Sequence, residues 1–134
     1  MSNYIAYEIY IGIDDENRWE SVIPYKIRDY TKGKGMTRIS LDYKDLYGHK
    51  PWWLSGDHNN DNVLWYYEWR IGFRSSRLTA LAFWEFIKKL VKKNILCRAL
   101  LMEYGNEDKG DYDYTDYEDI YCPKYSNPPS DFDL

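Results

Sequence analysis

The sequence predicts an α+β fold: a single compact domain in which a mainly antiparallel sheet carries one long amphipathic helix packed on one face. Three observations support this fold class. Residues 4–13, 37–43, 63–71 and 95–104 are strand-like runs, rich in β-branched and aromatic side chains. Residues 76–94 are the one segment with a convincing helical period. The 134 residues suffice for one domain with its own core, and no repeat or interdomain linker divides them.

The N-terminal part is expected to begin with a hairpin. Residues 4–13 alternate, with isoleucines and Tyr7 on one face and Glu8 on the other. After a polar turn, residues 19–23 are expected to form the returning strand, which Pro24 ends. The KGKG sequence at residues 32–35 indicates a flexible basic turn, because it lacks the strand-to-helix context of a phosphate-binding loop.

The central helix is predicted from its amphipathic pattern. Ser75 or Ser76 can cap its N-terminus, and Asn94 suits its C-terminal end. The strands at 63–71 and 95–104 flank the helix, which predicts a right-handed β-α-β crossover. The second of these strands is apolar on both faces, as expected for a strand covered on each side. The apolar sector of the helix contains Ala80, Phe83, Phe86, Ile87, Leu90 and Val91, with Trp84 at its margin, opposite Glu85, Lys88, Lys89, Lys92 and Lys93.

Charge is divided unevenly along the chain. Residues 1–102 hold 16 Lys and Arg against 12 acids, a balance of +4, whereas residues 103–134 hold 2 Lys against 10 acids, a balance of −8. Residues 70–98 contain eight basic residues and a single acid, Glu85. We therefore expect an α+β body at residues 1–105, which includes a basic strand-helix-strand unit, and an acidic, tyrosine-rich C-terminal segment at residues 106–134 with a flexible end.

The acidic segment is the strongest indication of function. Seven carboxylates lie within 13 positions from residue 107 to residue 119, interleaved with tyrosines. Such a run is either merely solvated, received by a cationic partner, or laid on the chain's own basic helix. If it is functional, its carboxylates and rings could imitate the phosphates and bases of a nucleic acid. The residues expected to contact a basic partner are Glu107, Asp108, Asp111, Tyr112, Asp113, Tyr114, Asp116, Tyr117, Glu118 and Asp119.

In size and composition the chain resembles the small acidic inhibitors that phages and mobile elements direct at host nucleases, including anti-CRISPR proteins and DNA mimics. That resemblance rests on acidity, aromatic content and length, with no shared motif. It implies a non-enzymatic viral protein-binding inhibitor that blocks a basic nucleic-acid-binding enzyme or complex through an acidic aromatic surface. Neither a cofactor nor a metal is expected.

A different class of function is a nucleic-acid-binding module. In this alternative the basic unit contacts phosphates, and the acidic segment regulates access to it. The overall acidity, with a pI of about 5.2, disfavours approach to DNA unless the acidic segment moves aside. A solvated helix face would show the same pattern. The residues expected to bind nucleic acid are Arg70, Arg74, Arg77, Lys88, Lys89, Lys92 and Lys93.

A third hypothesis is a small enzyme or metal-binding protein centred on residues 49–61. Residues 57–68 resemble the EF-hand calcium loop, but Asn62 replaces its glycine and the flanks read as loop and strand rather than helices. The two histidines, His49 and His58, are too few for a histidine zinc cluster, and catalysis is not expected.

The expected location is the cytoplasm, with no contact to a membrane. The N-terminus lacks the features of a signal peptide, and no apolar run approaches the length of about 20 residues that spans a bilayer. Cys97 and Cys122 are expected to be free thiols in a reducing compartment.

Overall fold

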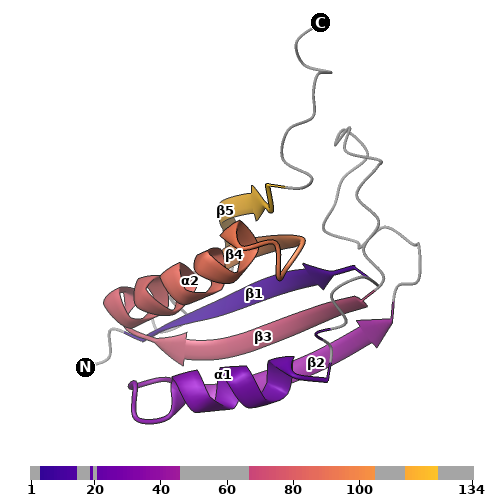
Figure 1. Cartoon of the computed structure of the whole chain (residues 1–134). Helices are drawn as coiled ribbons and strands as arrows, with labels where there is room; N and C mark the ends of the chain where they lie inside the picture. The colour runs from indigo at the N-terminus through magenta and orange to yellow at the C-terminus, as the bar shows by residue number, and fades with distance from the viewer. Residues whose placement is uncertain (1–3, 15–18, 20, 46–66, 105–113, 124–134) are drawn as a thin grey trace, which may run out of the picture.

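The computed structural model describes residues 4–14, 19, 21–45, 67–104 and 114–123. In these residues the elements, in chain order, are β1 (Ile5–Ile13), α1 (Ile23–Thr31), β2 (Thr37–Asp45), β3 (Tyr67–Ser75), α2 (Arg77–Lys92), β4 (Arg98–Tyr104) and β5 (Tyr114–Tyr121). The strands form one antiparallel sheet in the order β2-β3-β1-β4-β5 (Figure 1). The fold is therefore α+β with a mainly antiparallel sheet, as predicted.

The β3-α2-β4 unit joins two parallel strands through a helix, as predicted, but the two strands are not adjacent in the sheet. Strands β3 and β4 each pair antiparallel with β1, so they are parallel to one another with β1 between them. Strand β3 ends at Ser75, four residues after the predicted end at residue 71. Strand β1 is thus the central strand of the sheet, and it does not form a hairpin with the next segment of the chain.

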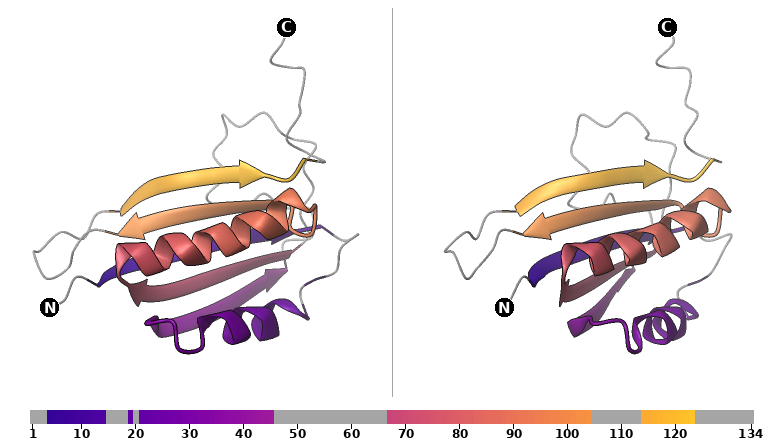
Figure 2. Two further views of the ribbon diagram at one scale, coloured as in Figure 1. Left: turned by 60° about the vertical axis from the view of Figure 1, so that its left-hand side comes forward. Right: turned by 90° about the vertical axis from the view of Figure 1, so that its left-hand side faces the viewer.

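The hydrophobic core lies between one face of the sheet and the two helices. Figure 2 shows α1 and α2 on the same side of the sheet. The Tyr30 ring of α1 stacks on Phe83 and Phe86 of α2, with ring centroids 5.1 and 4.6 Å apart, and so joins the two helices. The core residues include Tyr7, Ile9, Ile11 and Ile13 of β1, Ile71 and Phe73 of β3, Ala99 and Leu101 of β4, Ile23 and Ile27 of α1, and Ala80, Phe83, Trp84, Ile87 and Val91 of α2.

Helix α2, Arg77–Lys92, lies within the segment predicted to be helical, residues 76–94. Its N-cap is Ser76, whose hydroxyl accepts a hydrogen bond from the Thr79 N–H at 3.2 Å. Asn94, just beyond the helix, has a φ of +61°, the left-handed conformation that ends many helices. Leu78 lies off the apolar sector and is 81% exposed. The hydrophobic period therefore determined which side of this helix is buried.

Helix α1 corrects the prediction of a hairpin at residues 19–23. The Trp19 carbonyl accepts hydrogen bonds from the N–H groups of Val22 and Ile23, which form a turn into the helix rather than a returning strand. Pro24 lies in the first helical turn, where its missing N–H costs no hydrogen bond. Ile23 and Ile27, one turn apart, are its buried residues together with Thr31. In the described part of the chain, the sheet thus carries two helices on this face rather than the one predicted.

The opposite face of the sheet is polar but not fully exposed. Even-numbered residues of β1 and β4 point to this face, since their odd-numbered neighbours lie in the core. Tyr10, Leu100 and Met102 form a small second apolar cluster there, each no more than 3% exposed. Glu8 and Arg98 are also buried, with 7% and 1% exposed. Buried charges require partners, and these partners define the polar site described below.

Truncation of Ile87 should test whether α2 is held by the core. Ile87→Ala should lower the free energy of unfolding by about 2–5 kcal/mol, because it removes buried methyl groups and leaves a cavity. Leu78→Ala on the same helix is the control, and should change it by less than about 0.5 kcal/mol because Leu78 is exposed. Urea denaturation measures both, and equal effects would contradict the assigned helix face.

Candidate functional site

Strand β5 forms one edge of the sheet and contains the C-terminal part of the predicted partner-binding segment. It pairs with β4 from Arg98↔Tyr121 to Tyr104↔Tyr114, with an irregularity in register after Leu101. Two of its acids, Glu118 and Asp119, have described side chains, and consecutive residues of a strand point to opposite faces. Each of these acids meets a basic or N–H donor from the body of the protein.

Glu118 contacts α2 on the helix-covered face. Its Oε1 accepts a hydrogen bond of 2.6 Å from the Trp84 indole Nε1 and lies 3.5 Å from the Lys88 Nζ. Lys88 also forms an ion pair of 2.9 Å with Glu85, one turn earlier on α2. The hydrogen bond to Glu85, with the charge of Glu118 nearby, raises the pKa of Lys88. The indole N–H of the buried Trp84 therefore has a hydrogen-bond acceptor on the edge strand.

Asp119 contacts Arg98 on the opposite face. The two carboxylate oxygens accept hydrogen bonds from the Arg98 Nε, at 2.7 Å, and from its Nη2. Arg98 is only 1% exposed, and its guanidinium lies 4.4 Å from the centroid of the Tyr121 ring. A bidentate pair of this kind fixes the geometry of both side chains. Glu118 and Asp119 together form what we call the β5 clamp, which holds the strand from both faces.

The β5 clamp changes what the acidic segment can present. Glu118 and Asp119 each form an ion pair within the fold, with Lys88 and Arg98 respectively, so part of their negative charge is already offset. The backbone of Tyr114, Asp116 and Tyr117 lies in β5. Glu107, Asp108, Asp111, Tyr112 and Asp113 lie outside the described residues, and partner binding by the predicted segment stays a prediction.

The predicted nucleic-acid-binding residues do not form one surface. Arg70 pairs with Tyr10 across β1 and β3 and lies on the polar face, away from the helices. Arg77, at the start of α2, forms an ion pair of 2.6 Å with Glu103. The lysines that the structure brings together are at the C-terminal end of α2, where Lys89, Lys92 and Lys93 are exposed. Arg74 lies on β3, on the same face as Arg70, and Lys88 belongs to the contacts of Glu118.

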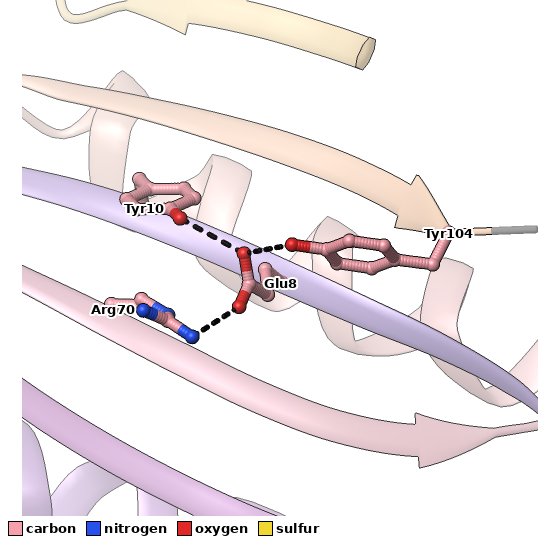
Figure 3. Close-up of polar contacts among 4 residues, drawn as sticks. All are labelled: Glu8, Tyr10, Arg70 and Tyr104. Carbon is pink, nitrogen blue, oxygen red and sulfur yellow. Dashed lines mark hydrogen bonds and ion pairs between the residues drawn. The ribbon is translucent and has the colours of Figure 1, made fainter. Parts of the chain in front are cut away.

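A polar cluster around Glu8 was not predicted from the sequence. Glu8 Oε1 accepts hydrogen bonds from the hydroxyls of Tyr10, at 2.9 Å, and Tyr104, at 2.6 Å. Glu8 Oε2 forms an ion pair of 2.7 Å with Arg70 Nη2 (Figure 3). These residues come from β1, β3 and β4, so the cluster crosses the three central strands. The sequence does contain a signal for this cluster, because Glu8 is a single acid within an otherwise apolar strand. A buried acid requires a partner.

The Glu8 cluster is suited to holding strands together. Burial raises the pKa of Tyr10, and its hydrogen bond to the Glu8 carboxylate raises it further. Burial is the largest single effect and acts to lower the pKa of Arg70, but the charge and hydrogen bond of Glu8, with the nearby Tyr10 and Asp42, together raise it. Both Glu8 oxygens accept from charged or hydroxyl donors, so direct contacts of this carboxylate join β1 to β3 and β4.

The remaining sequence candidates have simpler outcomes. Among the described residues, no group of three or more His, Cys, Asp or Glu side chains could hold a metal ion. Of the calcium-like loop, Tyr67 and Glu68 are described, both in β3, and Glu68 is buried; residues 57–66, with His58, and also His49 lie outside the described residues. Residues 32–35 form the predicted turn, with Gly33 and Gly35 in the left-handed region.

Both expected thiols, Cys97 and Cys122, are buried and form no disulfide. Burial raises the pKa of the Cys97 thiol, which disfavours the reactive thiolate. No helix in the described part of the chain combines the length and apolar character needed to cross a bilayer.

Comparisons with protein-family models, with curated proteins and with solved structures find no match for this chain.

The β5 clamp predicts unequal effects for its two acids. Asp119→Asn should lower the free energy of unfolding by about 3 kcal/mol, because it leaves the buried Arg98 charge without its counter-ion. Glu118→Gln should cost less than about 1 kcal/mol, since its ion pair is partly exposed and the amide still offers Trp84 an acceptor. Urea denaturation gives both values, and similar losses would rule out Arg98–Asp119 as the dominant contact.

The Glu8 cluster predicts a loss of stability at alkaline pH. The unfolded chain releases the Tyr10 proton near pH 10, whereas the folded protein, in which the pKa is raised, retains it. The unfolding free energy should therefore fall as pH rises above about 10, by up to about 1.4 kcal/mol per pH unit from this group. Tyr10→Phe should reduce this slope in urea midpoints measured from pH 8 to 11. Tyr25→Phe, at a position that is 67% exposed, should leave it unchanged.

Proposed function

We propose that this protein is a non-enzymatic inhibitor that captures a basic protein partner through the acidic, aromatic segment entering β5. The partner class that fits is a nucleic-acid-binding enzyme or complex, whose cationic surface would otherwise receive phosphates. In this proposal the chain acts as a nucleic-acid mimic of the kind that phages and mobile elements use against host nucleases, as anti-CRISPR proteins do.

The placement of the acidic segment carries this proposal. Tyr104 and Tyr114 are paired residues at one end of the β4-β5 ladder, and the chain passes between them through residues 105–113. Residues 107–116 hold five carboxylates and a single lysine, Lys109. Tethering both ends to the sheet reduces the conformational entropy that the segment loses when it binds a partner.

The contacts of the body supply the tethers. On the β4 side, the Tyr104 hydroxyl donates to the buried Glu8 carboxylate. On the β5 side, the clamp of Glu118 and Asp119 holds the strand against α2 and β4. The acids that anchor the strand and the acids proposed to meet a partner are therefore different residues, so the two roles can be tested separately.

The alternative, direct nucleic-acid binding by the basic unit, has weaker support. Its arginines lie on different faces, and Arg70, Arg77 and Lys88 already face carboxylates within the fold. Electrostatic contact with phosphates would have to compete with these ion pairs. The exposed lysines at the end of α2 are the part of this hypothesis that the geometry leaves available.

The proposed function predicts that capture depends on acids outside the clamp. Asp111→Asn, Asp113→Asn and Asp116→Asn, combined in one variant, should reduce recovery of a basic partner from lysate of the native source at least tenfold. The matched control combines Asp29→Asn, Asp42→Asn and Asp45→Asn, exposed acids on α1 and β2 that give the same change in charge. Quantitative mass spectrometry of the retained proteins measures the difference.

Inhibition requires a second measurement with the purified partner. Binding of nucleic acid by the purified partner should fall when the wild-type chain is added. The variant with residues 111, 113 and 116 neutralised should leave that binding unaffected. Equal capture by that variant and its control would refute the proposal. Retention of nucleic acid by the wild-type chain, lost on substitution of Lys89, Lys92 and Lys93 by Ala, would establish the alternative instead.

A further inference from the structure

A groove lies between α1 and β2, at the edge of the sheet opposite to β5. It is lined by Arg28, Thr31 and Lys32 of α1 and its C-cap, and by Ile39 and Leu41 of β2, with a volume of about 460 Å³. Figure 1 shows α1 running alongside β2 at this edge. The lining thus combines two apolar side chains with two cations and a hydroxyl, a composition suited to an amphipathic anionic ligand.

The two cations of the groove differ from the arginines that form ion pairs within the fold. Arg28 and Lys32 are one helical turn apart, so both can face the groove. Both are exposed, and no ion pair to either is formed within the described residues. Arg70, Arg77 and Arg98, by contrast, each face a carboxylate of the fold. Asp29 of α1 and Asp42 of β2 are exposed neighbours but do not line the groove.

Strand β2 forms the described edge of the sheet beside the groove. It is the outermost of the described strands on this side and pairs only with β3 among them. Eight of its nine residues are exposed, and only Leu41 is half-buried. Backbone N–H and C=O groups that point away from β3 can therefore accept another strand. The register with β3 is regular from Ser40 to Asp45, which gives six residues for pairing.

We propose that this edge binds an extended acidic segment of a partner protein, which adds a strand to β2. The incoming strand places one apolar side chain over Ile39 and Leu41 and carboxylates near Arg28 and Lys32. Because alternate residues of a strand share a face, the recognised pattern is an apolar residue with acids two positions before and after it. Four strand spacings, about 19 Å, separate β2 from β5, so this surface is distinct from the proposed acidic site. It is also opposite in charge, because its charged lining residues are Arg28 and Lys32.

The test uses a synthetic peptide with that pattern. The probe is a fluorescein-labelled, acetylated and amidated peptide, Thr-Asp-Thr-Ile-Thr-Asp-Thr, and its control replaces both Asp by Asn. Fluorescence anisotropy at low salt should show at least tenfold weaker binding of the control. In NMR spectra of the whole chain, the probe should shift amides of β2 and slow hydrogen exchange of those that do not pair with β3, a signature specific to strand addition.

Two variants of the chain locate the site. Arg28→Ala with Lys32→Ala should weaken binding of the Asp peptide at least fivefold, whereas Lys89→Ala with Lys92→Ala, which removes the same charge from α2, should leave it unchanged. Ile39→Asp introduces a like charge into the groove at a residue that is 38% exposed, and should abolish binding while the melting temperature stays close to the wild-type value. Both effects would support the proposal.

Three results would overturn it. The first is equal binding of the Asp peptide to the wild-type chain and to the Arg28/Lys32 variant, which would restrict these cations to stabilising the C-terminal end of α1. The second is binding without protection of β2 amides. The third is concentration-dependent self-association of the chain in sedimentation, lost in Ile39→Asp, which would assign the groove to a second copy of this protein instead of a partner.

Discussion

The buried guanidinium of Arg98 is the constraint on which the position of the edge strand β5 depends. An arginine that is 1% exposed needs a counter-ion, and Asp119 on the edge strand provides it with two hydrogen bonds. This requirement fixes the position of β5 against β4 from the polar face. On the other face, the Trp84 indole N–H needs an acceptor, and the neighbouring Glu118 provides it. The acidic edge strand is therefore held in place because Arg98 and Trp84 each need a hydrogen-bond acceptor, and its carboxylates provide these acceptors.

Strand β4 links this constraint to the rest of the sheet. Its first residue, Arg98, binds Asp119, and its last residue, Tyr104, donates to Glu8 at the centre of the polar face. Glu8 in turn binds Arg70 of β3, so polar contacts on this face run from β5 to β3. The helix-covered face is held by apolar and aromatic packing. One side of the sheet is therefore stabilised mainly by burial of apolar area and the other by satisfied charges.

How much the sequence predicted depends on whether an element is determined by local pattern or by distant contacts. Helix α2 and β1 were predicted because their apolar periods are long and regular. Helix α1 was missed because Pro24 reads equally well as the end of a strand and as the first turn of a helix. Strand β5 was not expected because adjacent carboxylates repel, and only the fold shows that Lys88 and Arg98 neutralise them. The basic unit was taken as one surface, although the alternation of β3 turns Arg70 away from α2.

Among the described residues, the two edges of the sheet also differ in charge. Strand β2 and α1 place the cations Arg28 and Lys32 at one edge, while the strand order places the acidic β5 at the other. The described charges at these two edges are therefore separated across the strands, in the plane of the sheet. Such a separation favours approach of a highly charged neighbour to the edge of opposite sign.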